Sequence, residues 1–275
     1  MFLYLGDDDI TRAAAYLSGV LTHFNIPFER VDSSASPPDD FTAKKYTGYI
    51  ISDYPAKQFR PGQMEHIRQS VANGAGLLML GGWESFHGQY GEYNNSPLAE
   101  VLPVEMQDTD DRRNCPQPVL LYKRREHPIL AGLPWDRAPF IGGFNQFIAK
   151  SGTVVLLKGI CTKFSIVAER VADWTTDSVL LSDSKPLESR LSFALPDGSA
   201  SCFLTLTEEH PVLVTSIYGT GKTAALATDV APHWAGNFVD WGKQRIVQEL
   251  PGGAGTVEFG ADYGKFFAQL VQWLK

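Results

Sequence analysis

The chain has 275 residues, 44% of them hydrophobic and 12% aromatic, which is enough to bury one large core. Its 24 basic and 31 acidic residues give a formal charge of −7, which argues against a nucleic-acid partner or an anionic membrane surface. The start MFLYLGDDD lacks the basic region of a signal peptide, and no apolar run approaches the ~18 residues of a membrane helix. The three cysteines are widely spaced, so we expect a cytoplasmic protein without membrane contact, disulfide framework or zinc site.

The first third of the chain alternates short apolar runs with amphipathic segments, a pattern typical of a parallel sheet with crossover helices. Strands are expected at Phe2–Leu5, Pro27–Val31, Tyr49–Ser52 and Gly76–Leu80, and helices at Thr11–Phe24 and from Pro61 to Val71. The glycine-rich and aromatic segment Gly81–Glu92 then leaves the carboxyl end of the fourth strand. Open α/β sheets place their binding sites at that end.

The second half predicts further strands and one elaboration within a single domain spanning residues 1–275. After a short helix at Ser96-Pro97, strands are expected at Val119–Tyr122 and Val154–Leu157. Short β-like runs between residues 159 and 209 predict an antiparallel β insertion, with strands at Ser165–Val171, Ser178–Leu181, Arg190–Ala194 and Ser201–Leu206. Its strand edges make this insertion the candidate interface of a homo-oligomer. The chain then predicts a hairpin of Val212–Ile217 with Thr223–Thr228, and a last helix whose apolar face runs from Phe259 to Leu274.

The sequence Gly219-Thr220-Gly221-Lys222-Thr223 resembles the end of a phosphate-binding loop, but its context does not. Such a loop needs an earlier glycine where this chain has Ser216, and it needs a helix after the lysine. We therefore predict a hairpin turn.

Three groups of polar residues are candidates for a site. Asp7-Asp8-Asp9 follows the first strand, where carboxylates could hold a metal, although an N-cap of the next helix is the stronger interpretation. His127 and His210 each precede a proline and are interpreted as turn residues, whereas His87 lies in the loop at the expected site.

Asp229, His233 and Trp234 lie within six residues of one another after the last hairpin strand. A carboxylate can orient a histidine as a general base, and the same aspartate can equally cap a turn above a packed histidine and tryptophan. Both interpretations stay open.

The segments GAGLLMLGGWESF (74–86) and PLAEVLPV (97–104) resemble a glutamine amidotransferase-like family related to the trehalose-utilisation, or ThuA-like, proteins. Four shorter matches follow in the family's order: HPI with GLP (127–134), YGTGK (218–222), TDVAPHW (228–234) and the final Trp273-Leu274. The resemblance implies a flavodoxin-like, doubly wound and mostly parallel sheet of the class I amidotransferase type, here with an antiparallel β elaboration.

The resemblance also implies a cysteine nucleophile on the turn after the Leu77–Leu80 strand, within a Gly-x-Cys-x-Gly pattern. This chain has Gly81, Gly82 and Trp83 there, so glutamine hydrolysis by the usual covalent route is not expected. Ser85 is the only serine or threonine of that loop and could replace the thiol, although a serine at this position is more often a helix cap.

We therefore expect a protein that binds a small polar ligand, such as a sugar or an amide, at the carboxyl ends of the strands and needs no cofactor. The expected ligand-binding residues are Asp7, Ser52, Asp53, Gly82, Trp83, His87 and Trp234, with Asp229 and His233 in the same pocket. The rival hypothesis is a hydrolase in which Asp229 and His233 form an acid–base pair, with Ser85 as candidate nucleophile and with a metal on Asp53 or on the Asp7–Asp9 cluster.

Overall fold

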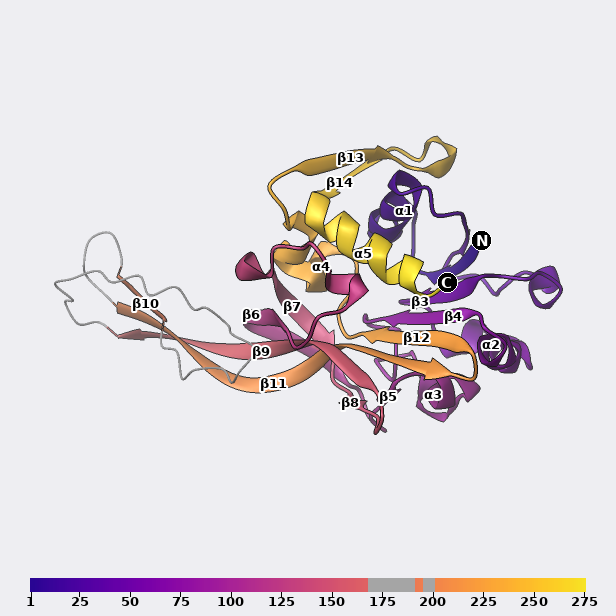
Figure 1. Ribbon diagram of the computed structural model, residues 1–275, viewed down its shortest axis with the longest axis horizontal. Coiled ribbons are helices and arrows are strands. Elements are labelled where there is room, and N and C mark those ends of the chain that lie inside the picture. The colour runs from indigo at the N-terminus through magenta and orange to yellow at the C-terminus, as the bar shows by residue number, and fades with distance from the viewer. Residues whose placement is uncertain (168–190, 195–200) are drawn as a thin grey trace.

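The fold is built around one ten-stranded mixed sheet, shown in the computed structural model of Figure 1, which describes residues 1–167, 191–194 and 201–275. The strand order is β2-β1-β3-β4-β12-β11-β9-β6-β7, with β10 paired to β11. From β2 to β12 neighbouring strands are parallel, and from β12 to β7 they are antiparallel. The sheet therefore has a parallel half and an antiparallel half.

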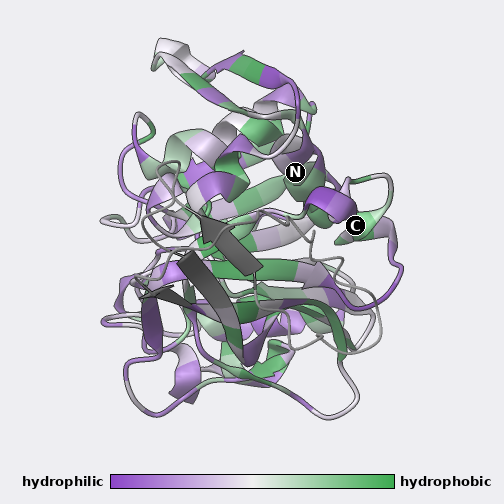
Figure 2. Cartoon of the chain, turned by 90° about the vertical axis from the view of Figure 1, so that its left-hand side faces the viewer, coloured by the Kyte–Doolittle hydropathy of each residue, from purple (hydrophilic) through white to green (hydrophobic). Residues whose placement is uncertain are grey.

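The central strands of the parallel half are apolar on both faces, as helix-covered strands require, whereas the edge strand β2 contains Glu29 and Arg30 and is mostly half-buried. The strands of this half are β1 (Phe2–Gly6), β2 (Phe28–Val31), β3 (Gly48–Ser52), β4 (Gly76–Leu80) and β12 (Gly221–Leu226). Every residue of β1, β3 and β4 is buried. Figure 2 shows these hydrophobic strands at the centre of the molecule, between helices whose outer sides are more hydrophilic.

Helices cover both faces of this half, which makes the fold doubly wound. The helices are α1 (Ala13–His23), α2 (Gln63–Ala72), α3 (Pro97–Val101), α4 (Pro232–Ala235) and α5 (Ala261–Trp273). Helices α1 and α5 pack together on one face, and α2 and α3 on the other (Figure 1). The predicted α/β class and flavodoxin-like architecture are confirmed. No helix among the described residues is both long and apolar enough to cross a membrane.

The antiparallel half contains β6 (Arg112–Lys123), β7 (Phe140–Asn145), β9 (Val154–Val167), β10 (Leu191–Ala194) and β11 (Ser201–Tyr218). Strands β9 and β11 are long and continue past the body of the molecule as a two-stranded arm, on which β10 adds to β11 (Figure 1).

Several predicted strands of the 159–209 stretch are parts of this arm. Ser165–Val171 begins in β9, Ser201–Leu206 begins β11, and Arg190–Ala194 corresponds to β10. The expected strand Ser178–Leu181 lies outside the described residues. In the described part, the elaboration thus extends strands of the main sheet.

Two small sheets complete the fold, β5 (Val104–Glu105) with β8 (Ile148–Ala149), and β13 (Arg245–Glu249) with β14 (Thr256–Gly260). The sequence did not predict the β13–β14 hairpin, and Phe259 belongs to β14 and not to the last helix, which begins at Ala261. The misplaced start of the helix has a simple cause. Phe259 is buried whether it belongs to a strand or to the helix, so the apolar pattern alone does not separate β14 from α5.

The turn predictions have mixed outcomes. Tyr218 pairs with Gly221 across a two-residue hairpin turn, as predicted, and Gly219 has a φ of 60°. His127 is the N-cap of a short 3-10 helix, where its ring accepts the Ile129 N–H at 3.3 Å. The turn prediction for His210 is wrong. This residue lies within β11, where a shift in strand register between Pro211 and Leu213 accommodates the proline.

Candidate functional site

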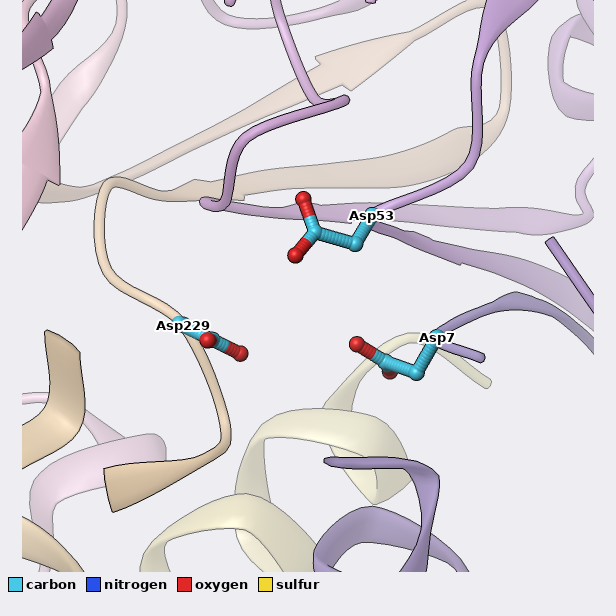
Figure 3. Close-up of side chains that lie close together, drawn as sticks. All are labelled: Asp7, Asp53 and Asp229. Carbon is cyan, nitrogen blue, oxygen red and sulfur yellow. The ribbon is translucent and has the colours of Figure 1, made fainter. Parts of the chain in front are cut away.

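Three aspartates converge at the carboxyl edge of the parallel half. Asp7 follows β1, Asp53 follows β3, and Asp229 comes shortly after β12. Carboxyl ends of parallel strands share one edge of the sheet, so residues far apart in the sequence meet there. One carboxylate oxygen from each residue lies within 4.8 Å of the other two, and Figure 3 shows the three side chains directed toward a common space.

The backbone at two of these aspartates is strained. Asp7 has a φ of 49° and Asp53 a φ of 42°, in the left-handed region that side-chain-bearing residues seldom adopt. Such positions cost about 1–3 kcal/mol each and are concentrated at functional sites. Arg30 supports this edge, because one of its nitrogens donates to the carbonyls of Gly6, Asp7 and Asp8 at 3.0, 3.3 and 3.0 Å.

The environment of the three carboxylates disfavours their charged forms. Burial raises the pKa of Asp7 to about 7, against the opposing effect of a hydrogen bond donated by the Tyr4 hydroxyl. Burial and the nearby Asp7 charge raise the pKa of Asp53 to about 8. Burial, then Asp53 and Asp7, raise the pKa of Asp229 well above its ordinary value. Perturbed carboxylates of this kind are characteristic of functional sites.

The turn after β4 approaches this cluster so closely that it needs glycine. A Cβ at Gly82 would stand 2.1 Å from Asp53 Oδ1, and Gly82 has a φ of 155°. The N–H of Glu84 donates to the same Asp53 oxygen at 2.8 Å. The carboxylate of Asp53 therefore occupies the space in front of the turn.

Sequence reasoning missed two residues that hold this turn, Asn145 and Asp111. The Asn145 side chain accepts the Gly82 N–H at 2.8 Å, donates to the Gly82 carbonyl at 3.1 Å, and donates to Asp111 at 2.7 Å. Asp111 also accepts the backbone N–H groups of His87 and Gly88 at 3.1 and 3.0 Å. Neither residue belongs to a periodic segment, and the strand that carries Asn145 was not predicted.

A cleft of about 400 Å³ lies beside the cluster, lined by Asp7, Asp8, Ala13, Ser33, Asp53, Trp83, Glu84, Gln89 and Tyr90. Trp83 is 43% exposed and Tyr90 50% exposed. The Arg112 guanidinium lies 4.4 Å from the centre of the Trp83 ring, and the His233 ring lies 6.2 Å from it. The cleft thus combines aromatic surfaces with hydrogen-bond acceptors.

The remaining predicted site residues divide into those near the cluster and those turned away from it. Ser52 is buried at the end of β3, next to Asp53. The Ser85 hydroxyl is buried and accepts the Asp53 N–H at 2.9 Å, so it has a structural partner and no contact with solvent. His87 is half-buried outside the cleft lining, with its ring Nδ1 3.1 Å from the Gly88 carbonyl.

Asp229, His233 and Trp234 have different partners in the structure. One oxygen of Asp229 accepts the N–H groups of Val230 and Ala231 at 2.5 and 3.1 Å, so this residue caps a turn. His233 is exposed, and among the described contacts none joins it to Asp229. Trp234 is buried and donates to Asn114 at 2.7 Å, which places its ring away from the cleft.

The sequence matches a protein family described as "Putative glutamine amidotransferase" over residues 50–186 and 192–248, more than half of the chain. The chain belongs to this family. No curated protein has a significantly similar sequence.

Two solved structures from Salmonella typhimurium have the same fold as this amidotransferase-like chain. Cytoplasmic protein STM1381 from Salmonella typhimurium is 23% identical with a TM-score of 0.69, covering 100% of this chain and 99% of its own. Cytoplasmic protein STM3548 from the same organism is 22% identical with a TM-score of 0.67, covering 99% and 98%. A ThuA-like protein from Bacteroides uniformis is 11% identical with a TM-score of 0.48, covering 99% and 89%.

Proposed function

We propose that this amidotransferase-like chain is a cytoplasmic protein that binds a small polar ligand, a sugar or an amide, and that it is not a glutaminase. The cleft carries the proposal, because the carboxylates of Asp7 and Asp53 lie beside the exposed rings of Trp83 and Tyr90. Aromatic rings stack on the apolar face of such a ligand, while carboxylate oxygens accept hydrogen bonds from its hydroxyl or amide groups.

The turn after β4 supports the absence of glutaminase chemistry. A nucleophile there needs a projecting thiol and free backbone N–H groups for the oxyanion. In this chain Gly82 has no side chain, its N–H is bonded to Asn145, and the Glu84 N–H is bonded to Asp53.

The two cysteines whose side chains the structure describes do not replace the missing nucleophile. Cys115 and Cys161 lie on β6 and β9, outside the lining of the cleft. Burial raises the pKa of Cys115 to about 11 and also raises the pKa of Cys161. Both are therefore thiols at neutral pH, and a thiol is a poor nucleophile. The names of the two Salmonella proteins are consistent with the proposed cytoplasmic location.

Trp83→Ala tests the ligand site. Thermal unfolding would be measured with monosaccharides, disaccharides and primary amides, including glutamine, and a compound that raises Tm should do so less for Trp83→Ala. Phe140→Ala is the control, since Phe140 is also an exposed aromatic (38%) but lies on β7 outside the cleft. A compound that binds by calorimetry yet stabilises both proteins equally would remove Trp83 from the site. Ammonia release from glutamine above the protein-free rate would refute the non-glutaminase assignment.

Hydrolysis by Asp229 and His233 is the second candidate, favoured by the exposed His233 ring near Trp83. It requires Asp229 to leave its turn hydrogen bonds and to orient His233. Turnover of nitrophenyl esters or glycosides that is abolished by His233→Ala, with unchanged Tm, would favour it over simple binding.

A further inference from the structure

We infer that Asp7, Asp53 and Asp229 together form a binding site for a divalent cation that prefers oxygen ligands: Mg²⁺, Mn²⁺ or Ca²⁺. The three carboxylates come from three different strand ends, and a hard cation selects such donors over nitrogen or sulfur. The inference concerns the ion alone and does not depend on the organic ligand proposed above.

The spacing of the oxygens suits one shared ion. Two ligands of the same ion are at most two metal–oxygen bonds apart, which is about 4.2 Å for Mg²⁺ and about 4.6–5.2 Å for Ca²⁺. One oxygen from each aspartate lies within 4.8 Å of the others. Because three ligands of one ion cannot all lie opposite one another, binding requires the carboxylates to rotate toward a common centre, less for Ca²⁺ than for Mg²⁺ or Mn²⁺.

Two buried polar atoms at the cluster lack a well-formed hydrogen bond in the part of the chain that the structure describes. Asp7 is 1% exposed, and within the described part of the chain its Oδ1 accepts no hydrogen bond of normal geometry, while its Oδ2 accepts the Tyr4 hydroxyl. The fully buried Ser52 hydroxyl lies near enough to Asp7 to lower the pKa of that carboxyl, but it too forms no hydrogen bond of normal geometry with a described residue. Figure 3 shows the Asp7 carboxylate directed toward Asp53 and Asp229. A buried polar atom without a partner calls for an explanation, and a bound ion supplies it for Asp7.

The cluster has no ion-pair partner in the described part of the chain, and only the more distant Arg30 charge lowers the pKa of Asp7. Among the described residues, no lysine, arginine or histidine forms an ion pair with any of the three aspartates. Arg30, the basic residue at this edge, donates to backbone carbonyls and approaches the carboxylate of Asp32 at 3.5 Å. Buried carboxylates are normally paired or coordinate a metal.

An ion can reach the cluster from the cleft. Asp7 and Asp53 line the cleft, so water can complete the coordination shell from that side. Asp229 lies behind them and is 6% exposed.

For the test, the full chain is first treated with EDTA to remove bound metal, and the EDTA is then removed. MnCl₂, MgCl₂ and CaCl₂ are titrated separately by calorimetry, up to about 5 mM, and bound Mn²⁺ is counted by electron paramagnetic resonance. We expect saturable binding of one ion per chain. Asp53→Asn and Asp229→Asn should each weaken Mn²⁺ binding at least about tenfold, because each removes one charged ligand.

Asp9→Asn is the matched control, since it removes the same charge two residues away from Asp7 at an exposed side chain outside both the cluster and the cleft. Its affinity for Mn²⁺ should stay close to that of the wild-type chain, and circular dichroism verifies that every variant is folded. No saturable binding of any of the three ions would overturn the inference. Equal Mn²⁺ affinity of wild type and both cluster variants would also overturn it, by placing the ion elsewhere.

The failure of this inference can be told apart from failure of the proposed ligand site. The titrations contain no organic compound, and Trp83→Ala should keep Mn²⁺ binding within about twofold because its side chain supplies no oxygen ligand. A loss of Mn²⁺ binding in Trp83→Ala equal to that in Asp53→Asn would contradict the assignment of the ion to the three carboxylates.

Discussion

Gly82 is required by its surroundings as well as by its backbone angle. A Cβ there would stand 2.1 Å from Asp53 Oδ1, and the φ of 155° is strained for any other residue. We expect Gly82→Ala to lower the free energy of unfolding by about 2–4 kcal/mol. Gly152→Ala is the control, because Gly152 also has a positive φ of 80° but nothing within 4 Å of its added Cβ. Urea unfolding of both variants measures the difference, and equal losses would show that the contact with Asp53 is unimportant.

The carboxylate cluster predicts an unusual pH dependence for the metal-free protein. The pKa values of Asp7 and Asp53 are raised to about 7 and about 8, so the folded chain holds protons that the unfolded chain releases above about pH 4. Their contribution to stability is therefore fully present at low pH and is lost as pH rises through about 7–8. In EDTA, urea unfolding of wild type should show this loss between about pH 5 and about pH 9, by several kcal/mol.

Asp53→Asn tests this effect, because it removes one titrating carboxylate and also one of the charges that raise the pKa of Asp229. Subtracting its profile cancels the opposite contribution of groups such as His127, whose pKa is lowered by burial. The stability of Asp53→Asn relative to wild type should rise with pH over the same range. A constant difference between the two profiles would mean that Asp53 titrates normally.

At the scale of single residues, the sequence predicted which residues lie at the candidate site better than it predicted their arrangement. Asp7, Asp53 and Asp229 were each expected at a strand end, yet nothing in one sequence shows that their oxygens meet. Asn145 and Asp111 carried no signal, because their roles arise from hydrogen bonds to the backbone of a distant loop. The position of Trp234, buried with its N–H on Asn114, depends on packing against β7, which the sequence did not predict.

Among the elements, β7 fixes the loop 81–92 through its last residue. Asn145 bonds both to the Gly82 backbone and to buried Asp111. Asn145→Ala should cost about 2–4 kcal/mol, because it removes one hydrogen bond from the buried Asp111 carboxylate and leaves two Gly82 backbone groups without partners. It should also speed hydrogen exchange in the loop. Asn237→Ala is the control, since exposed Asn237 accepts a single bond, from the Phe140 N–H at 2.9 Å. A similar small loss in both variants would contradict the role of Asn145.

Elements were predictable where burial imposes a continuous pattern. The strands β1, β3 and β4 are buried along their whole length, and their expected bounds differ from the observed ones by one residue at most. The strands β7 and β13 escaped prediction for different reasons. Two glycines interrupt the apolar pattern of β7, and the residues of β13 are exposed or half-buried, with Val247 66% exposed.

On the scale of the whole molecule, the two halves of the sheet differ in how their edges are covered. The parallel half carries the cleft and is enclosed by helices, whereas the arm of β9 and β11 extends past the body (Figure 1). Strand β6 pairs with β9 only as far as Cys161. From Thr162 to Val167, β9 therefore has β11 on one side and, within the described part of the chain, no strand on the other.

An open strand edge is a template for pairing with another chain, so we predict that the arm mediates a homo-oligomer. Light scattering of the full chain should then give a mass that is a multiple of 30.3 kDa. Lys163 and Thr205 are paired in register, so an Asn-Gly turn can join β9 to β11 there in place of residues 164–204. The shortened chain should be monomeric, whereas Val247→Lys, on the distant β13, should leave the assembly intact because its charge lies outside the arm. A monomeric full chain, or a shortened chain that still assembles, would exclude the arm as the interface.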